Sequence, residues 1–334
     1  MTGDDAVPAL RADRLGKRYG HVWGLRDCTF AVPAGSVVGL VGPNGAGKTT
    51  LLALVVGLLA PTEGEVAVFG EASRAYTEST LARVSYLAQD HPLYRGFSVA
   101  DMFHFGRSMN PSWDQELAQT RMDALGIPLR RKVKELSGGQ QAQVSLTMAL
   151  AKRTPLLILD EPVASLDPIA RLEFMRDVMA ASAEGGLTVI IASHVVSELE
   201  RLCDWLIVLS GGRLQLAGPV DDLLDAHRML TVPRPVPDGE LPGMVIDRAD
   251  SDRHSSVIVA ADLGQLAAAQ RPGWQAEPVG FEQLVLAYLR RPPVGGGVRS
   301  GGRAAERAEG RVGPGGRSGR GSGTTGAAKG AVIR

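Results

Sequence analysis

The segment from Gly42 to Thr50 carries the residue types of a phosphate-binding loop. It fits the pattern G-x-x-x-x-G-K-[ST] and reads Gly42-Pro43-Asn44-Gly45-Ala46-Gly47-Lys48-Thr49-Thr50. The glycines let the backbone curl so that successive N–H groups point at phosphate oxygens. Lys48 can reach the β- and γ-phosphates, and the Thr49 hydroxyl can hold Mg²⁺. The loop alone predicts a nucleoside triphosphate site, since an ordinary Gly-rich turn would not require Lys-Thr at its end.

Two adjacent carboxylates follow a second apolar run. Asp160 and Glu161 come directly after residues 156–159, a short apolar run that is typical of a buried strand. The end of that strand would place Asp160 beside the phosphate-binding loop, where it can help to hold Mg²⁺. Glu161 would then be positioned to polarise an attacking water. An ordinary solvated turn is the plainer interpretation of two such carboxylates.

A second anion site is indicated further along the chain. Ser137 stands at the start of a helical run, 89 residues after Lys48. A serine hydroxyl and glycine N–H groups at a helix N-terminus attract anions. The residues concerned are Ser137, Gly138, Gly139 and Gln140.

The elements that would position these residues predict an α/β fold. Apolar runs at 37–41, 156–160 and 188–192 alternate with helical patterns, as in a parallel sheet that is covered on both faces. Strand patterns with turns occupy residues 8–35 and 61–90. Residues 205–218 suggest a terminal hairpin, and residues 92–135 are mostly helical, with Ser98 and Asp114 as candidate helix N-caps.

The order of these motifs resembles one family. The chain looks like the ATP-binding cassette of an ABC transporter, the nucleotide-hydrolysing subunit, over about residues 8–225. Pro162 and the segment Ser165-Leu166-Asp167 also stand in the family order. The resemblance implies a P-loop NTPase cassette with a parallel core sheet, an antiparallel β subdomain and a helical subdomain. It also implies ATP and Mg²⁺ as ligands, and hydrolysis of ATP.

The resemblance assigns three further site residues. Gln89 matches the family position that senses Mg²⁺ and the attacking water, and His194 matches the switch histidine that contacts the γ-phosphate. Tyr19 matches the aromatic residue that stacks on adenine. Each also has a plainer interpretation, because surface glutamines, structural histidines and core tyrosines are common.

The resemblance also implies partners. The Ser137 site would face the γ-phosphate bound to a second cassette, identical or different, and Asp167 would lie at the same seam. A separate transmembrane permease would dock near residues 93–97. This contact would hold the chain peripherally at the cytoplasmic face of the cell membrane. A looser similarity, to subunits of bacterial drug- and peptide-export systems, favours export over import.

Composition excludes several other classes. Of 36 basic and 36 acidic residues, eight basic and two acidic ones lie in residues 292–334, so the remainder is net negative and a nucleic-acid-binding fold is disfavoured. The acidic first residues predict no signal peptide, and the longest apolar stretch, 51–60, is much shorter than the roughly 20 residues that span a bilayer. Cys28 and Cys203 lack metal-ligand spacing. Their side chains are expected to be buried, in a protein that resides in a reducing compartment.

The domain boundaries follow changes in composition. The cassette is predicted at residues 8–228, with its helical subdomain at about 92–152. Prolines after residue 229 mark a linker into a small α+β appendage at 229–291, with two or three strands and a helix. The Gly/Arg-rich residues 292–334 are predicted to be a disordered tail, because they hold almost no large apolar side chains.

Two alternatives compete with transport. Soluble ABC ATPases act on ribosomes or DNA, but the ribosomal kind usually has two cassettes and this sequence has one phosphate-binding loop. The DNA-repair kind inserts a long coiled coil after the position of Gln89, and here only 48 residues separate Gln89 from Ser137. A small-molecule kinase would not need the Ser137 segment.

Overall fold

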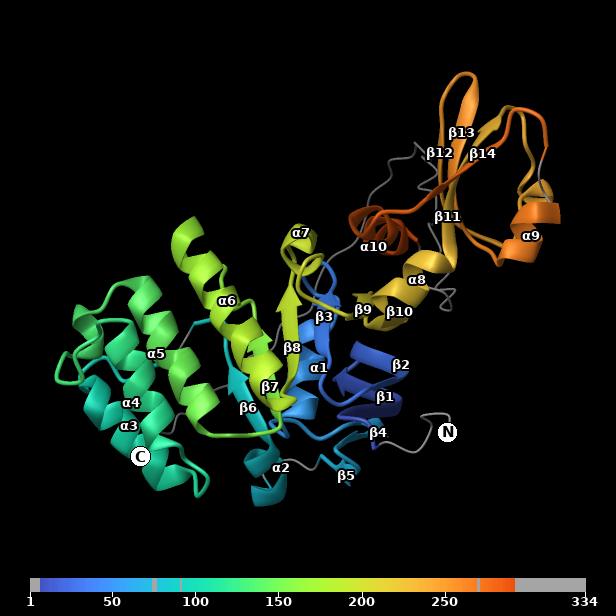
Figure 1. Ribbon diagram of the computed structural model, residues 1–334. Helices are drawn as coiled ribbons and strands as arrows, with labels where there is room; N and C mark the ends of the chain where they lie inside the picture. Colours follow the sequence, from blue (N-terminus) through green and yellow to red (C-terminus); the bar gives the residue numbers. More distant parts are fainter. Residues whose placement is uncertain (1–6, 74–76, 91, 269–270, 292–334) are drawn as a thin grey trace, which may run out of the picture. The chain divides into compact units, whose positions relative to one another are not determined.

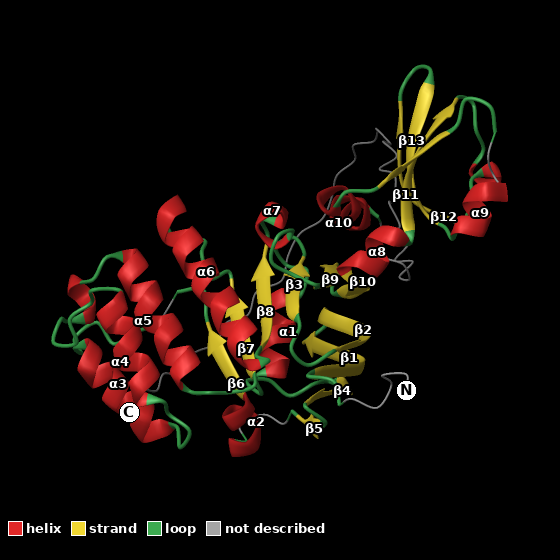
Figure 2. Cartoon of the chain, viewed as in Figure 1, coloured by secondary structure: helices red, strands yellow, loops and turns green. Residues whose placement is uncertain are grey.

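A mostly parallel sheet forms the centre of the computed structural model (Figures 1 and 2). The structure describes residues 7–73, 77–90, 92–268 and 271–291. The strand order is β10-β9-β3-β8-β7-β6, with β10 antiparallel at one edge and the other neighbours parallel. The strands are β3 (Val37–Val41), β6 (Val84–Leu87), β7 (Leu156–Asp160), β8 (Thr188–Ser193), β9 (Trp205–Ser210) and β10 (Arg213–Pro219). The predicted α/β class is confirmed.

Both faces of this sheet are buried, because alternate strand residues point to opposite sides. One face packs against α5 (Gly138–Ala151) and α6 (Pro168–Gly185). The other face packs against α1 (Lys48–Val55) and a second, antiparallel sheet. Within β7, Leu157 and Leu159 belong to the first core, while Leu156 and Ile158 belong to the second. The central sheet is thus buried between two hydrophobic cores.

The second sheet is the predicted antiparallel β subdomain. Its strand order is β2-β1-β4-β5, and all neighbours pair antiparallel. The strands are β1 (Leu10–Tyr19), β2 (Val22–Val32), β4 (Glu63–Val68) and β5 (Glu71–Ala72). Cys28 is buried in its core and Cys203 is buried on the opposite side of the central sheet, as the sequence analysis expected, and both are free thiols.

A helical segment lies beside the sheet edge formed by β6. It contains α3 (Val99–Met109) and α4 (Gln115–Ala124), which pack with α5 around the buried Phe103. The predicted N-caps are confirmed: the Ser98 hydroxyl accepts a hydrogen bond from the Asp101 amide, and the Asp114 carboxylate accepts one from the Leu117 amide. Shorter helices are α2 (Glu78–Arg83), α7 (Val196–Leu199), α8 (Val220–Asp225) and the 3₁₀ turn η1 (Val133–Glu135).

The C-terminal appendage contains a sheet with order β12-β13-β11-β14. Its elements are β11 (His227–Pro233), η2 (Asp238–Glu240), β12 (Met244–Asp250), β13 (His254–Ala260), α9 (Leu263–Ala268), β14 (Gln275–Pro278) and α10 (Phe281–Arg290). The expected two or three strands become four, because β11 precedes the proline-rich segment and pairs with both β13 and β14. β11 also begins before the predicted domain boundary at residue 228, which remains a prediction.

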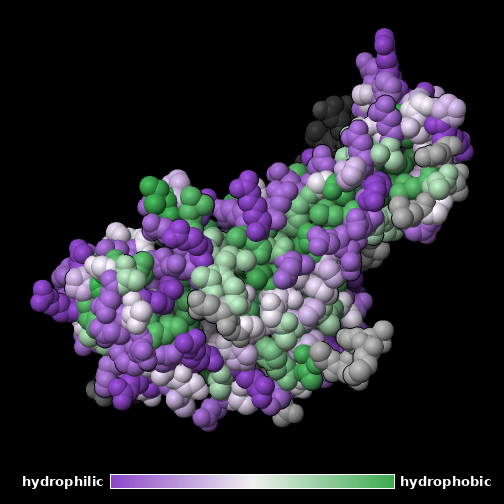
Figure 3. Space-filling view, viewed as in Figure 1, coloured by the Kyte–Doolittle hydropathy of each residue, from purple (hydrophilic) through white to green (hydrophobic). Residues whose placement is uncertain are grey.

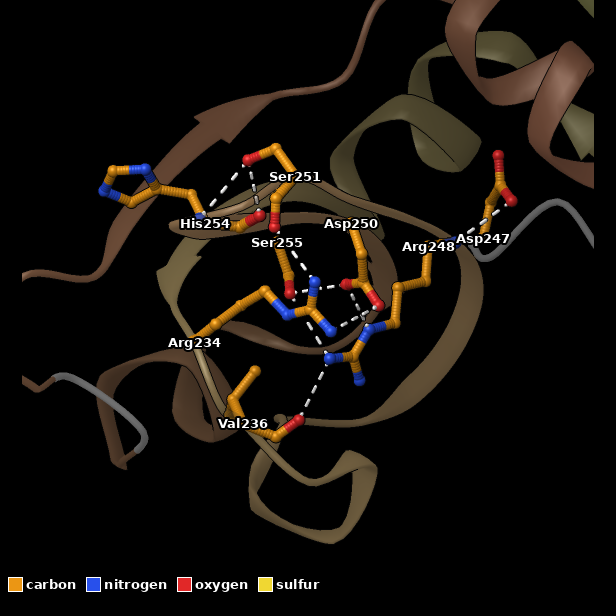
Figure 4. Close-up of polar contacts among 8 residues, drawn as sticks. All are labelled: Arg234, Val236, Asp247, Arg248, Asp250, Ser251, His254 and Ser255. Carbon is orange, nitrogen blue, oxygen red and sulfur yellow. Dashed lines mark hydrogen bonds and ion pairs between the residues drawn. The ribbon is translucent and has the colours of Figure 1, made fainter.

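A polar cluster joins the strands of the appendage (Figure 4). The Asp250 carboxylate accepts hydrogen bonds from the Ser255 hydroxyl at 2.6 Å and from Nε of Arg248 at 2.9 Å. Arg248 also donates to the Val236 carbonyl at 3.1 Å, and Arg234 lies 3.5 Å from Asp250. Hydrogen bonds to Ser255 and Arg248 lower the pKa of Asp250. The cluster therefore satisfies its own polar groups and stabilises the strand ends.

Helix α10 packs its apolar face against the central domain. Phe281, Leu284 and Val285 are buried in the same core as Leu199 and Leu206, and α10 contacts α7, α8 and β9. Among the described helices, none combines the length and apolar character that crossing a bilayer demands. The predicted disordered tail at 292–334 lies outside the described residues.

Candidate nucleotide site

The phosphate-binding loop connects β3 to the N-terminus of α1, as the sequence pattern predicts. Gly45 and Gly47 adopt φ values of 80° and 103°, which side chains with a Cβ atom rarely tolerate. A Cβ atom on Gly47 would also lie 2.5 Å from the Gly24 carbonyl oxygen. Lys48 is buried and its Nζ donates to the Gly42 carbonyl at 2.6 Å. The loop is therefore held in a curled form, with the ammonium group of Lys48 on the inside of the curl.

The loop lines a cavity of about 250 Å³ at the carboxyl edge of the central sheet. Besides the loop itself, this cavity is lined by Gln89, Asp160, Glu161 and Gly24. Its loop residues are Pro43, Asn44, Gly45, Ala46, Gly47, Lys48, Thr49 and Thr50. Four segments far apart in the sequence thus meet in one polar cavity, and three of them, the loop, Gln89 and the Asp160-Glu161 pair, are those that the sequence motifs indicated.

Asp160 ends β7 next to the loop. The residue is 6% exposed, and burial raises the pKa of its carboxyl group, while hydrogen bonds from Tyr86 and Thr49 oppose that rise. The Tyr86 hydroxyl donates to Oδ2 of Asp160 at 3.3 Å. A carboxylate and a threonine hydroxyl are hard oxygen ligands of the kind that Mg²⁺ prefers. The donor set at this edge therefore fits Mg²⁺ bound together with substrate phosphates.

Glu161 is held from two sides. Its Oε1 atom lies 3.9 Å from Nζ of Lys48, and its Oε2 atom lies 2.8 Å from Nδ1 of His194. His194 follows β8, and the Glu161 amide donates to the Ala192 carbonyl on the same strand at 2.9 Å. Glu161 has a φ of 49°, a left-handed conformation that is unfavourable for a residue with a Cβ atom. The backbone hydrogen bond and the two side-chain contacts fix this carboxylate at the cavity wall.

Tyr19 lies at the rim of the loop. Its side chain is 48% exposed, and its hydroxyl oxygen is 3.5 Å from that of Thr50. A Cβ atom on Gly24 would lie 2.8 Å from the Tyr19 ring, so the glycine leaves room for the ring beside β2. An exposed ring beside the phosphate-binding loop is free to stack on a base. Its plainer interpretation as a core tyrosine does not fit this exposure.

The Ser137 segment and Asp167 lie outside this cavity. Ser137 caps α5 in a reciprocal capping box with Gln140, and Asp167 caps α6 by accepting hydrogen bonds from the Ile169 and Ala170 amides. A Cβ atom on Gly139 would lie 3.0 Å from that of Ala170, so the two helix N-termini are neighbours. Within one chain, the predicted site residues therefore form two separate groups.

Comparison with known proteins identifies the family of this chain. The profile of the ABC transporter family matches residues 25–164. The petrobactin import ATP-binding protein FpuC of Bacillus anthracis is 33% identical over 215 residues, covering 61% of this chain and 79% of FpuC. The chain belongs to the ABC transporter family of ATP-binding proteins.

Further relatives include importers and an exporter. The Nod factor export ATP-binding protein I of Cupriavidus pinatubonensis is 35% identical over 236 residues, covering 66% of this chain and 70% of that protein. The Fe(3+) ions import ATP-binding protein FbpC of Pseudomonas fluorescens is 36% identical over 216 residues; the match covers 63% of this chain but only 61% of FbpC. A solved ATP-binding subunit of an ABC transporter matches 64% of this cassette protein and 91% of its own chain, with a TM-score of 0.59 and 25% identity.

Membership of this family implies the general activity, which is hydrolysis of ATP. Proteins of this family are ATPases, and this ABC protein takes ATP with Mg²⁺. The cavity chemistry agrees, because it combines loop N–H groups, a buried lysine and two oxygen donors for the metal. When bound, Mg²⁺ would neutralise charge on the phosphate oxygens.

An apolar groove of about 490 Å³ is lined by residues of the edge strand β6, of α3 and α5, and of the segment that follows Gln89. Its walls include Leu93, Tyr94 and Phe105, and the side chains of Tyr94 and Phe105 are 57% and 41% exposed. The two rings meet edge to face with their centroids 5.7 Å apart. The sequence pointed to residues 93–97 as a docking segment, and its two aromatics, Tyr94 and Phe97, are on the surface rather than in the helix core. Phe105 lies outside that predicted segment.

Two residues of the site had no sequence signal that we recognised. Gly24 lines the nucleotide cavity, but it is an isolated glycine within β2. Tyr86 contacts Asp160, but in the sequence it is one aromatic residue in a short strand. Its position three residues before Gln89 was the only available hint, and it does not reveal which way the hydroxyl points.

Proposed function

We propose that this ABC ATPase drives transport through a separate membrane permease, which docks in the groove formed by Leu93, Tyr94 and Phe105. The observation that carries this proposal is the position of the groove. It lies against β6, and the loop after β6 carries Gln89 into the nucleotide cavity. A helix of the permease bound in this groove would therefore contact the segment that leads directly to the site of hydrolysis.

The side chains of the cavity divide the chemistry among them. The loop amides and Lys48 would hold the β- and γ-phosphates, and Thr49 and Asp160 would hold Mg²⁺. Glu161 would accept a hydrogen bond from the attacking water and orient it. His194 would keep the Glu161 carboxylate in place through their 2.8 Å contact and would approach the γ-phosphate from the β8 side. Gln89 would complete the wall next to the metal.

The second group of residues supports a dimer of cassettes. The exposed N-terminus of α5, with Ser137, Gly138 and Gly139, offers amides to an anion that the same chain does not supply. Ile169 and Leu172, just after Asp167, are 70% and 73% exposed, and Figure 3 shows apolar surface at that end of α6. A second cassette would cover this surface and bring its own ATP to Ser137. Two ATP molecules would then lie at the seam.

Export is the direction that we favour for the transporter. Among the relatives described above, the Nod factor export protein matches the longest segment, 236 residues. This support is separate from the ATPase chemistry, which is the same for either direction. The protein would lie at the cytoplasmic face of the membrane because its permease holds it there.

Copurification tests the permease proposal. The chain is expressed together with membrane proteins encoded beside it, and the detergent-solubilised membrane fraction is captured through a tag on the chain. Phe105→Ser should abolish capture of the permease, because it removes an exposed aromatic wall of the groove. The control is Met109→Ser on the same helix, which removes a 66% exposed apolar side chain outside the groove and should leave capture intact. Cosedimentation of the wild-type chain with ribosomes instead of membranes would favour the soluble alternative.

A further inference from the structure

Tyr86 belongs to both sites of the molecule. It lies on β6, where it pairs with Ile158 of β7, two residues before Asp160. Its hydroxyl donates a hydrogen bond to Oδ2 of Asp160 at 3.3 Å. Tyr86 is also among the residues that line the apolar groove, together with Tyr94 and Phe105. The same residue therefore touches a candidate metal ligand and the candidate docking surface.

The Tyr86 hydroxyl is a permanent donor in this contact. A tyrosine phenol is protonated at physiological pH, because its ordinary pKa is about 10. The ionised carboxylate of Asp160 has only acceptor atoms, so the hydrogen bond has one direction. The Thr49 hydroxyl provides a second hydrogen bond to the same carboxylate. Two donors from two different elements thus fix the orientation of a side chain that is only 6% exposed.

We propose that Tyr86 is a positioning residue that orients the Asp160 carboxylate for the metal, and that it links the occupancy of the groove to the metal site. Groups that hydrogen-bond a metal-ligating carboxylate set its orientation, and their removal commonly costs tenfold or more in metal affinity. A shift of β6 caused by an occupant of the groove would move the Tyr86 hydroxyl relative to Asp160. Only the identity of that occupant rests on the function proposed above.

The first experiment measures the metal site without turnover. Mn²⁺ is titrated into wild-type and Tyr86→Phe proteins that are saturated with a non-hydrolysable ATP analogue, and free Mn²⁺ is read by electron paramagnetic resonance. Tyr86→Phe keeps the ring and removes only the hydroxyl, so we expect about tenfold weaker Mn²⁺ binding. Because the phenylalanine preserves the packing of the ring, a loss of Mn²⁺ affinity would report the loss of the hydroxyl group.

Tyr288→Phe is the matched control for this titration. It also removes a phenol hydroxyl that hydrogen-bonds a side chain, the imidazole of His227 at 2.9 Å, but Tyr288 is a buried residue of α10 and does not line the nucleotide cavity. Its Mn²⁺ affinity should equal that of the wild type. Equal Mn²⁺ affinities in Tyr86→Phe and wild type would overturn the positioning role, as would tighter binding in Tyr86→Phe.

The second experiment tests the link to the groove with no permease present. F105C is labelled with a bulky maleimide, which reacts selectively because Cys28 and Cys203 are buried. The label should change Mn²⁺ affinity by about threefold or more when Tyr86 is present, and by less in combination with Tyr86→Phe, as a coupled pair requires. Labelled M109C on the same helix is the control and should change nothing. An equal effect of the F105C label in both backgrounds, or no effect in either, would overturn the link while leaving permease docking to be judged by copurification.

Discussion

The Nδ1 atom of His194 lies 2.8 Å from Oε2 of Glu161, and this contact joins the ends of two adjacent parallel strands. The Glu161 backbone at this point has a φ of 49°, in the left-handed region. Such a conformation costs on the order of 1–2 kcal/mol for a residue with a Cβ atom. The hydrogen bond from the Glu161 amide to Ala192 and the contact with His194 hold it there. The carboxylate is therefore fixed in direction before any substrate binds.

Glu161 and Lys48 should separate hydrolysis from binding. Glu161→Gln should retain ATP binding and lower turnover by at least about 100-fold, because the amide cannot accept a proton from water. Lys48→Ala should lose ATP binding, because the buried cation that faces the phosphates is removed. Binding is measured with a fluorescent ATP analogue and turnover by phosphate release. A Glu161→Gln protein with normal turnover would show that another group activates the water.

His194 should act through Glu161. His194→Ala should lower kcat more than it raises KM, since the histidine holds a carboxylate that is needed in the transition state. The loss should be smaller than that of Glu161→Gln. In the Glu161→Gln background, His194→Ala should have little further effect, because the two side chains form one unit. Multiplying losses in the double variant would contradict this dependence and indicate a separate role at the γ-phosphate.

Ser137 should lie at the seam of an ATP-dependent dimer. In the Glu161→Gln background, ATP and Mg²⁺ should produce a dimer in static light scattering. Adding Ser137→Arg should return the protein to monomers, because the guanidinium group would fill the anion site at the α5 N-terminus.

Ser98→Arg controls for the loss of a helix cap. Ser98 caps α3 through the same reciprocal capping box that Ser137 makes for α5, so both variants lose a cap that stabilises by about 1 kcal/mol. The Ser98→Arg protein should still dimerise with ATP. A dimer that persists in Ser137→Arg would place the α5 N-terminus away from the seam.

The sequence predicted the local structural elements of this chain better than it predicted the contacts between distant residues. The phosphate-binding loop, β7 and the caps at Ser98 and Asp114 follow from local patterns, because a motif or a cap depends on residues within a few positions. The contact between Tyr86 and Asp160 depends on the order of β6 and β7 in the sheet. Such a non-local pairing leaves no periodic signal in either strand.

The appendage shows the same limit. β11 pairs with β13 and with β14, and these strands are separated in sequence by turns and by α9. Its pattern, from His227 to Pro233, ends in the proline-rich segment that the sequence suggested as a linker. Only the partner strands show that β11 is central in its sheet. The roles of the site residues and the domain boundaries remain predictions.

Gly47 should tolerate no side chain. Gly47→Ala would combine a φ of 103° with a Cβ atom 2.5 Å from the Gly24 carbonyl oxygen. We expect a loss of about 2 kcal/mol or more in unfolding free energy, together with loss of ATP binding. Gly96→Ala is the control, because a Cβ atom there meets nothing within 4 Å. Denaturant unfolding measures both, and an unchanged midpoint in Gly47→Ala would mean that the loop relaxes freely.

His227 should make stability depend on pH. The imidazole is 3% exposed; its Nδ1 lies 2.6 Å from the Leu223 carbonyl oxygen and its Nε2 2.9 Å from the Tyr288 hydroxyl. Burial lowers its pKa below the usual value of about 6.5, although the hydrogen bond to Leu223 opposes this. The unfolded chain then binds the proton more readily than the folded chain. Stability from His227 is therefore complete above pH 6.5 and is lost as pH falls toward the lowered value.

The comparison of His227→Gln with wild type isolates this effect, because every other titrating group is shared. Urea midpoints are measured at pH 7.5 and pH 5.5 for both proteins. The wild type should lose more stability between these values than His227→Gln, whose amide does not titrate. Tyr288→Phe keeps the histidine but removes a hydrogen-bond partner of its Nε2, so it should retain a pH-dependent loss. Parallel losses in wild type and His227→Gln would show that the folded chain takes up the proton as readily as the unfolded chain, so that burial does not disfavour the charged imidazole.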